Sequence, residues 1–193
     1  MFALNLPNVL TLLRILLVPV LVVVLLGETE NGDLWAAIVF GLASATDAMD
    51  GYLARSRNAI TSFGKLMDPI ADKLLIIAAL VSLVSLDRLA AWVAMVIIAR
   101  ELTVTLTRMQ ASQQGVVIAA NSWGKAKTIV QVAAIFFLIV AGDPSPVWVD
   151  GLVYGAVVIT IVSGVDYFFG LRRVLREAEA RREAAPLRSP QQP

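Results

Sequence analysis

The clearest chemical signal in this chain of 193 residues is a group of four aspartates, Asp47, Asp50, Asp68 and Asp72. Because residues three or four apart share a face of a helix, the first pair and the last pair each form one acidic stripe. The chain has no His and no Cys, so its strong metal ligands are oxygens, which favour Mg²⁺ or Mn²⁺ over Zn²⁺. Carboxylates from two neighbouring helices suit a pair of such ions about 3.5–4 Å apart. The spacing therefore predicts a site for two divalent cations.

The residues between the acidic pairs extend this prediction toward a diphosphate. Gly51 and Ala54 share the first stripe, and such small residues leave room for a ligand or another helix near the backbone. Arg55 follows, and its guanidinium matches the geometry of a phosphate. Metals, a floor of small residues and an arginine together describe a diphosphate site. Carboxylates within a membrane also form cation pathways, so a divalent-cation transporter remains the alternative from a different functional class.

The elements that carry these residues are apolar runs long enough to cross a bilayer. Hydrophobic residues make up 58% of the chain, and the mean hydropathy is +0.77. We therefore predict an all-α integral membrane protein with six transmembrane helices and a polar, metal-binding cavity at the cytoplasmic side. The expected spans are residues 7–26, 34–53, 65–85, 89–110, 124–141 and 147–170. Residues 1–173 would form one membrane domain, and 174–193 a basic, partly disordered cytoplasmic tail.

Charge differs between the two sides of these spans. The loops after the first, third and fifth spans carry six acidic residues opposed by one arginine: Glu28, Glu30, Asp33, Asp87, Asp143, Asp150 and Arg88. The other side carries Arg55, Arg57 and the arginines of the tail. By the positive-inside rule, we expect a multi-pass protein of the cytoplasmic (inner) membrane with both termini and the aspartates facing the cytoplasm. Residues 1–8 carry no Lys or Arg, so we expect the first span to be retained rather than cleaved.

Further charged residues interrupt the later spans. Arg100 and Glu101 lie in the middle of the fourth, where they must face protein or water. An ion pair between helices and an acceptor site are both compatible with them, and Arg108 follows two turns later. Lys125 and Lys127 open the fifth span, where lysines oppose the helix dipole and suit a bound anion.

The stretch from Asp47 to Asp72 resembles the signature of the CDP-alcohol phosphatidyltransferase family, D-x2-D-G-x2-A-R-x8-G-x3-D-x3-D, without departure. The resemblance implies a six-helix membrane protein that usually forms homodimers. Its members transfer a phosphatidyl or similar group from a CDP-linked donor to an alcohol and release CMP. No nucleic acid is expected among the partners.

The resemblance also implies roles for individual residues. Asp47 and Asp68 would contact both metals, Asp50 one and Asp72 the other, and Asp72 would also be the general base. The opening PNVLT looks like the entry of a first helix that closes over the donor. Contacts to CDP-diacylglycerol are accordingly expected from Asn8, Thr11, Gly51, Ala54, Arg55, Thr61 and Gly64.

Three further stretches, NLPNVLTLLR, RELTVTLTR and SWGKAKTIVQ, look like the phosphatidylglycerophosphate synthase branch of the family. The acceptor in that branch is glycerol 3-phosphate, a dianion that needs a basic pocket. We expect that pocket to contain Arg100, Arg108, Lys125 and Lys127. A cardiolipin synthase that uses phosphatidylglycerol and an inositol-phosphate-using relative remain alternatives within the family.

Overall fold

The computed structural model describes the backbone of residues 6–27, 29–57, 62–113 and 122–184, and the side chains of 9–27, 29–46, 70–71, 73–111 and 126–172. The described residues form six helices and no strand, which confirms the all-α prediction. The helices are α1 (Leu6–Leu26), α2 (Gly32–Arg57), α3 (Ser62–Ser85), α4 (Ala91–Gln113), α5 (Ser122–Ala141) and α6 (Val147–Ala184).

Several helices are longer than the sequence predicted. Both halves of the aspartate motif are helical, because α2 continues to Arg57 and α3 begins at Ser62. The loop expected at residues 111–123 is shorter, since α4 continues to Gln113. The sixth span and the basic segment after it form one helix, as expected for a helix that continues into water. Of the tail expected at residues 174–193, residues 174–184 belong to α6, and 185–193 lie outside the described residues.

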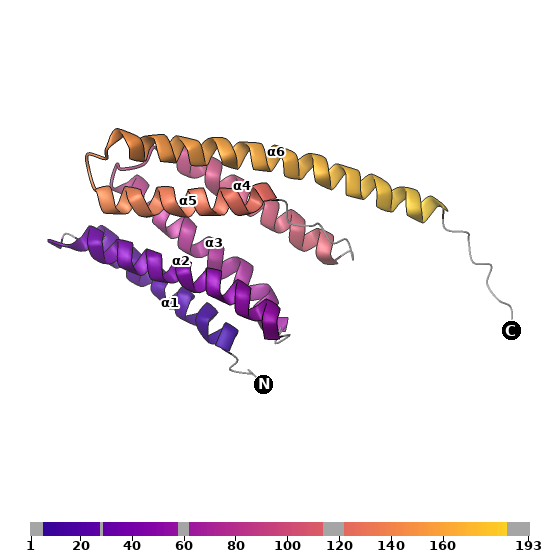
Figure 1. Cartoon of the computed structure of the whole chain (residues 1–193), viewed down its shortest axis with the longest axis horizontal. Coiled ribbons are helices and arrows are strands. Elements are labelled where there is room, and N and C mark those ends of the chain that lie inside the picture. Colours follow the sequence, from indigo (N-terminus) through magenta and orange to yellow (C-terminus); the bar gives the residue numbers. More distant parts are fainter. Residues whose placement is uncertain (1–5, 28, 58–61, 114–121, 185–193) are drawn as a thin grey trace.

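Successive helices run up and down, so that three connections gather at one end of the molecule, on the left in Figure 1. There, Arg88 donates a hydrogen bond of 2.6 Å from Nη1 to Oδ1 of Asp33, which joins the α3–α4 turn to the start of α2. Gly142 ends α5 with a φ of +67°, a conformation that favours glycine. A Cβ at Gly142 would lie 3.2 Å from Oδ2 of Asp33, so the α5–α6 turn reaches the same place.

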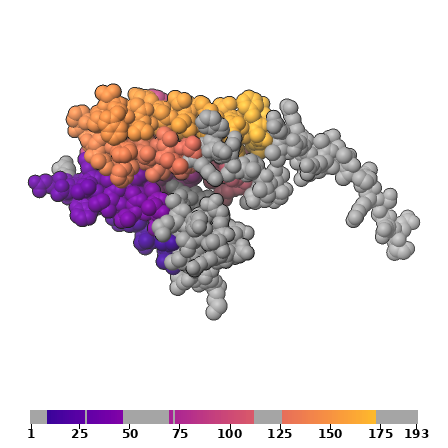
Figure 2. Space-filling view, viewed as in Figure 1, coloured from indigo at the N-terminus to yellow at the C-terminus, as the bar shows by residue number. Residues whose placement is uncertain are grey.

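The helices pack in two groups that share a core. The α1 helix packs against both α2 and α3, whereas α6 packs against α4 and α5. The contacts of α5 with α2 and of α4 with α3 join the groups. Phe40, Leu83 and Ile139 are fully buried between them. Figure 2 shows the side chains of α5 and α6 as one layer over those of α1 and α2.

Large apolar side chains also cover the outside of the bundle, which soluble monomers avoid. Val23 is 71% exposed, Ile129 is 70% exposed and Val158 is 59% exposed. Among the residues with described side chains, two stretches are long and apolar enough to cross a membrane, Val9–Leu26 and Val147–Arg172, and only 22% and 28% of their residues are buried. Core helices of a soluble protein would be mostly buried, so these apolar faces are suited to lipid.

Candidate active site

The two halves of the aspartate motif end at the same place in the fold. Asp47 and Asp50 belong to the last turns of α2, and Asp68 and Asp72 belong to the first turns of α3. These helix ends lie together, away from the three connections (Figure 1). The side chains of these four aspartates lie outside the described residues, so the metal site remains a prediction. A donor set made only of carboxylate oxygens is chemically suited to hard divalent cations.

Most of the expected donor contacts also fall outside the described side chains. These residues are Asn8, Gly51, Ala54, Arg55, Thr61 and Gly64. Thr11 is described, and only 3% of it is exposed.

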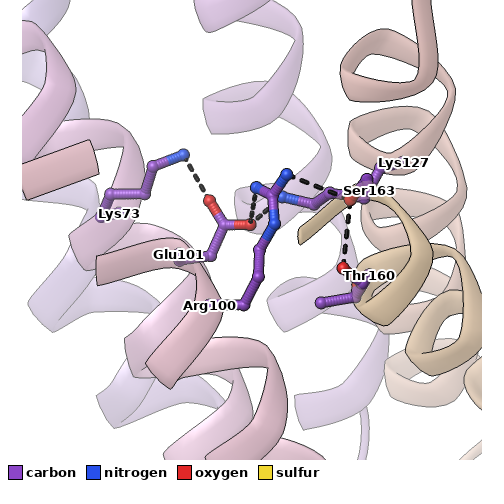
Figure 3. A network of polar contacts seen from close by, with 6 residues as sticks. All are labelled: Lys73, Arg100, Glu101, Lys127, Thr160 and Ser163. Carbon is purple, nitrogen blue, oxygen red and sulfur yellow. Dashed lines mark hydrogen bonds and ion pairs between the residues drawn. The ribbon is translucent and has the colours of Figure 1, made fainter. Parts of the chain in front are cut away.

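Beside the aspartate segments lies a buried ionic network centred on Glu101, which is 3% exposed. Its Oε2 lies 2.7 Å from Nζ of Lys73 on α3, and its Oε1 forms an ion pair with Nζ of Lys127 on α5. Nη1 of Arg100 lies 3.5 Å from the same Oε1 (Figure 3). One carboxylate on α4 thus joins basic side chains from three helices.

The network continues from Arg100 to α6. Nη2 of Arg100 donates a hydrogen bond of 3.0 Å to Oγ of Ser163, which donates one of 3.1 Å to the carbonyl of Thr160 (Figure 3). Gly164 lies against this arginine: a Cβ there would be 3.4 Å from Cγ of Arg100, in van der Waals contact, so a side chain larger than a methyl group would press on the arginine. The arginine therefore crosses between α4 and α6 at a position without a side chain.

Within this network, three basic side chains face one carboxylate. Buried charges without counter-charges are costly, because the interior screens and solvates them poorly. Lys127 is only 4% exposed, so water does little to solvate its ammonium group. An anionic ligand would place a favourable negative charge beside Lys127.

A cavity of about 320 Å³ opens onto this network. Five helices contribute polar groups to its lining, through Arg14, Ser44, Lys73, Glu101, Lys127, Thr128 and Gln131. Ser44 lies three residues before Asp47, and Lys73 directly follows Asp72. The cavity therefore adjoins both halves of the aspartate motif.

Arg14 also lines this cavity, although it lies within the apolar helix α1. It is 1% exposed and is the largest of the fully buried side chains. Arg14 is buried because α1 packs against both α2 and α3, which places this face of the helix inside the bundle.

The four residues expected to bind the acceptor do not all converge. Arg100 and Lys127 meet at Glu101, as described above. Arg108 is exposed, and its guanidinium carbon lies 5.9 Å from the ring centroid of Tyr167. The side chain of Lys125 lies outside the described residues. The ion pair that the sequence left as one alternative for Arg100 and Glu101 is present, and an acceptor site is compatible with it because Glu101 and Lys127 line the cavity.

Five polar residues of the cavity were not among the site residues expected from the sequence. They are Arg14, Ser44, Lys73, Thr128 and Gln131, each next to or within an apolar run. Gln131 follows Lys127 by four residues and so shares its face of α5. This spacing was the signal that could have identified Gln131: a polar residue one helical turn after a lysine, at the start of an apolar run.

Comparison with known proteins agrees with this arrangement. The family model described as CDP-alcohol phosphatidyltransferase matches residues 4–163. A Bacillus subtilis protein named CDP-diacylglycerol–glycerol-3-phosphate 3-phosphatidyltransferase is 43% identical, over 85% of this chain and 93% of the relative. A Mycobacterium tuberculosis protein named probable phosphatidylglycerophosphate synthase is 40% identical, over 94% of this chain and 87% of the relative. A Rickettsia felis protein with the same name as the Bacillus relative is 36% identical, over 85% of this chain and 93% of the relative.

The family match covers most of the chain and includes the whole aspartate motif. The relatives align along nearly their full length. This chain belongs to the CDP-alcohol phosphatidyltransferase family.

Proposed function

We propose that this chain transfers the phosphatidyl group of CDP-diacylglycerol to glycerol 3-phosphate, giving phosphatidylglycerophosphate and CMP. The names of the relatives and the family match support this reaction. The structural observation that carries the choice of acceptor is the buried basic cavity beside the aspartate segments.

The phosphate of the acceptor would be suited to the basic side chains that gather at Glu101. Glycerol 3-phosphate is a dianion, and its phosphate would add negative charge beside Arg100 and the buried Lys127, which both contact the carboxylate of Glu101. Arg100 and Lys127 would bind the phosphate, and Arg108 and Lys125 would extend the basic surface toward the cytoplasm. Lysine and arginine are the side chains best suited to a phosphate, as a point charge and as a planar fork.

Two divalent cations, Mg²⁺ or Mn²⁺, would be held by Asp47, Asp50, Asp68 and Asp72. Members of the family generally depend on divalent metals. When bound, such ions neutralise the negative charge of the diphosphate and of the transition state. Six further positions, together with Arg55, would contact the donor: Asn8, Thr11, Gly51, Ala54, Thr61 and Gly64.

Asp72 would act as the general base. Its carboxylate would take the proton from the primary hydroxyl of glycerol 3-phosphate. The resulting oxygen nucleophile would attack the phosphorus that carries diacylglycerol, and the bond from that phosphorus to the CMP oxygen would break. Arg55 would stabilise the charge that develops on the phosphoryl oxygens.

The family is membrane-bound, and two helices of this chain are long and apolar enough to span a bilayer. We propose that all six helices span the cytoplasmic membrane and that the aspartate end faces the cytoplasm. The arginines on the aspartate side, Arg55 and Arg57 among them, against Arg88 in the opposite loops, support this orientation. The substrate CDP-diacylglycerol would enter laterally from the inner leaflet, and a homodimer is proposed from the family resemblance.

The decisive experiment is CMP release by the purified protein with CDP-diacylglycerol, Mg²⁺ or Mn²⁺, and one acceptor at a time. Release that depends on glycerol 3-phosphate supports the proposal. Release with phosphatidylglycerol alone indicates a cardiolipin synthase. Release with inositol phosphate alone indicates an inositol-phosphate-using member of the family. Metal flux into liposomes without CMP from any acceptor would favour the transporter.

A further inference from the structure

The basic cavity also contains an uncharged polar group without a partner. Gln131 is 3% exposed and lines the cavity, yet its Oε1 has no hydrogen-bond partner among the described residues. Ser44 lines the same cavity from α2, and its Oγ is likewise buried without a partner in the described part of the chain. Buried polar atoms are nearly always hydrogen-bonded, so two such atoms in one cavity point to a ligand.

The hydroxyl of Ser44 differs from that of its neighbour Thr46. Oγ1 of Thr46 donates to backbone carbonyls of its own helix at 2.8 Å, to Leu42 and to Ala43. A serine in a helix has the same option, because its hydroxyl reaches the preceding turn. Oγ of Ser44 does not use that option and remains available to a molecule in the cavity.

Gln131 and Lys127 lie one turn apart on the same face of α5. The cavity thus has an ion pair, where Lys127 meets Glu101, and an uncharged polar side chain, Gln131, one turn further along α5. One helical turn rises about 5.4 Å, a distance that a three-carbon phosphate can bridge. A ligand with a phosphate at one end and a hydroxyl beyond it would match both parts.

We propose that Gln131, assisted by Ser44, recognises the secondary hydroxyl of the phosphorylated three-carbon acceptor. This inference rests on the proposed function and extends it, because Gln131 then determines which phosphorylated alcohols are accepted. Oε1 of Gln131 accepts the hydrogen bond from the hydroxyl, and Oγ of Ser44 donates to the hydroxyl oxygen. An acceptor without that hydroxyl leaves both groups buried and unpaired, which is how polar sites reject such analogues.

The test compares glycerol 3-phosphate with 3-hydroxypropyl phosphate, which keeps the phosphate and the primary hydroxyl but lacks the secondary hydroxyl. The wild-type protein should use the analogue with a kcat/KM about 10- to 100-fold lower. In Gln131→Met, kcat/KM for glycerol 3-phosphate should fall by a similar factor, and the two acceptors should become nearly equivalent. The KM for CDP-diacylglycerol should change little, because the subsite contacts only the acceptor.

Gln110→Met is the matched control, since Gln110 is an exposed glutamine near the end of α4. That variant should discriminate between the two acceptors as the wild-type protein does. Ser44→Ala is the milder second variant if Gln131→Met does not fold, and it should lose part of the discrimination.

Equal use of both acceptors by the wild-type protein would overturn the inference. A Gln131→Met or Ser44→Ala variant that still discriminates fully between the two acceptors would also overturn it. The absence of CMP release with glycerol 3-phosphate in the wild-type protein would instead refute the proposed function itself, so the two failures are distinguishable.

Discussion

Nζ of Lys73 lies 2.7 Å from Oε2 of Glu101, so an ion pair joins the residue after Asp72 to the middle of α4. The second oxygen of that carboxylate pairs with Lys127 on α5. Glu101 thereby links α3, whose first turns carry Asp68 and Asp72, to α5, which carries the predicted acceptor contact Lys127. Because the pair fixes how α3 sits against α4, it also limits where the aspartates of α3 can lie.

Glu101→Gln should destabilise the protein and weaken use of the acceptor. The substitution removes the counter-charge of Lys127, which is 4% exposed, and breaking a buried pair costs about 3–5 kcal/mol. Denaturant unfolding in detergent measures the stability loss, and kcat/KM for glycerol 3-phosphate measures the loss of acceptor binding.

Asp33→Asn provides the control for that variant, because it breaks the ion pair with Arg88 at the opposite end of the bundle. The Asp33 side chain is 36% exposed, so the loss should be about 1 kcal/mol or less, with acceptor kinetics unchanged. Equal effects of the two variants on acceptor kinetics would mean that Glu101 has no specific role there.

Asp72→Asn should abolish turnover while CDP-diacylglycerol binding largely persists. The amide cannot accept the proton of the attacking hydroxyl, and a positioned general base contributes about 10²- to 10⁴-fold to rate. CMP release and donor binding are measured on the same preparation. A variant with a nearly normal rate would show that another group is the base.

Removal of divalent metal should stop the reaction reversibly. Four aspartates without bound cations would repel one another and could not bind a diphosphate. CMP release should disappear with excess EDTA and return with added Mg²⁺ or Mn²⁺. In Asp47→Asn, the concentration of metal needed for half-maximal activity should rise. Activity that survives complete chelation would contradict the assignment of the aspartates.

Gly164→Val should displace Arg100 and raise the KM for glycerol 3-phosphate. The space beside Gly164 is occupied by Cγ of Arg100, 3.4 Å from the position of an added Cβ. Overpacking of this kind costs about 1–3 kcal/mol, and the displaced arginine loses its hydrogen bond to Ser163.

Gly155→Val on the same helix is the matched control, because nothing lies within 4 Å of a Cβ at that position. Its kinetics should remain close to those of the wild-type protein. If the two variants behave alike, the close approach at Gly164 does not position Arg100.

The helices could be predicted from the sequence because apolar runs separated by short polar segments have few other ways to fold in lipid. Their ends could not, since hydropathy does not register polar residues that continue a helix into water. For this reason α2 extends to Arg57 and α4 to Gln113, beyond the predicted spans.

The sequence by itself determined the chemistry that this chain offers: oxygen ligands at fixed helical spacing, in a motif that resembles one family. Spacing along one helix says which residues share a face, but it does not say what that face meets. Only the tertiary structure decided that Arg14 is buried and that Glu101 pairs with Lys73 and Lys127 as well as with its neighbour Arg100. These contacts depend on how α1, α3, α4 and α5 pack, and packing joins residues far apart in the chain.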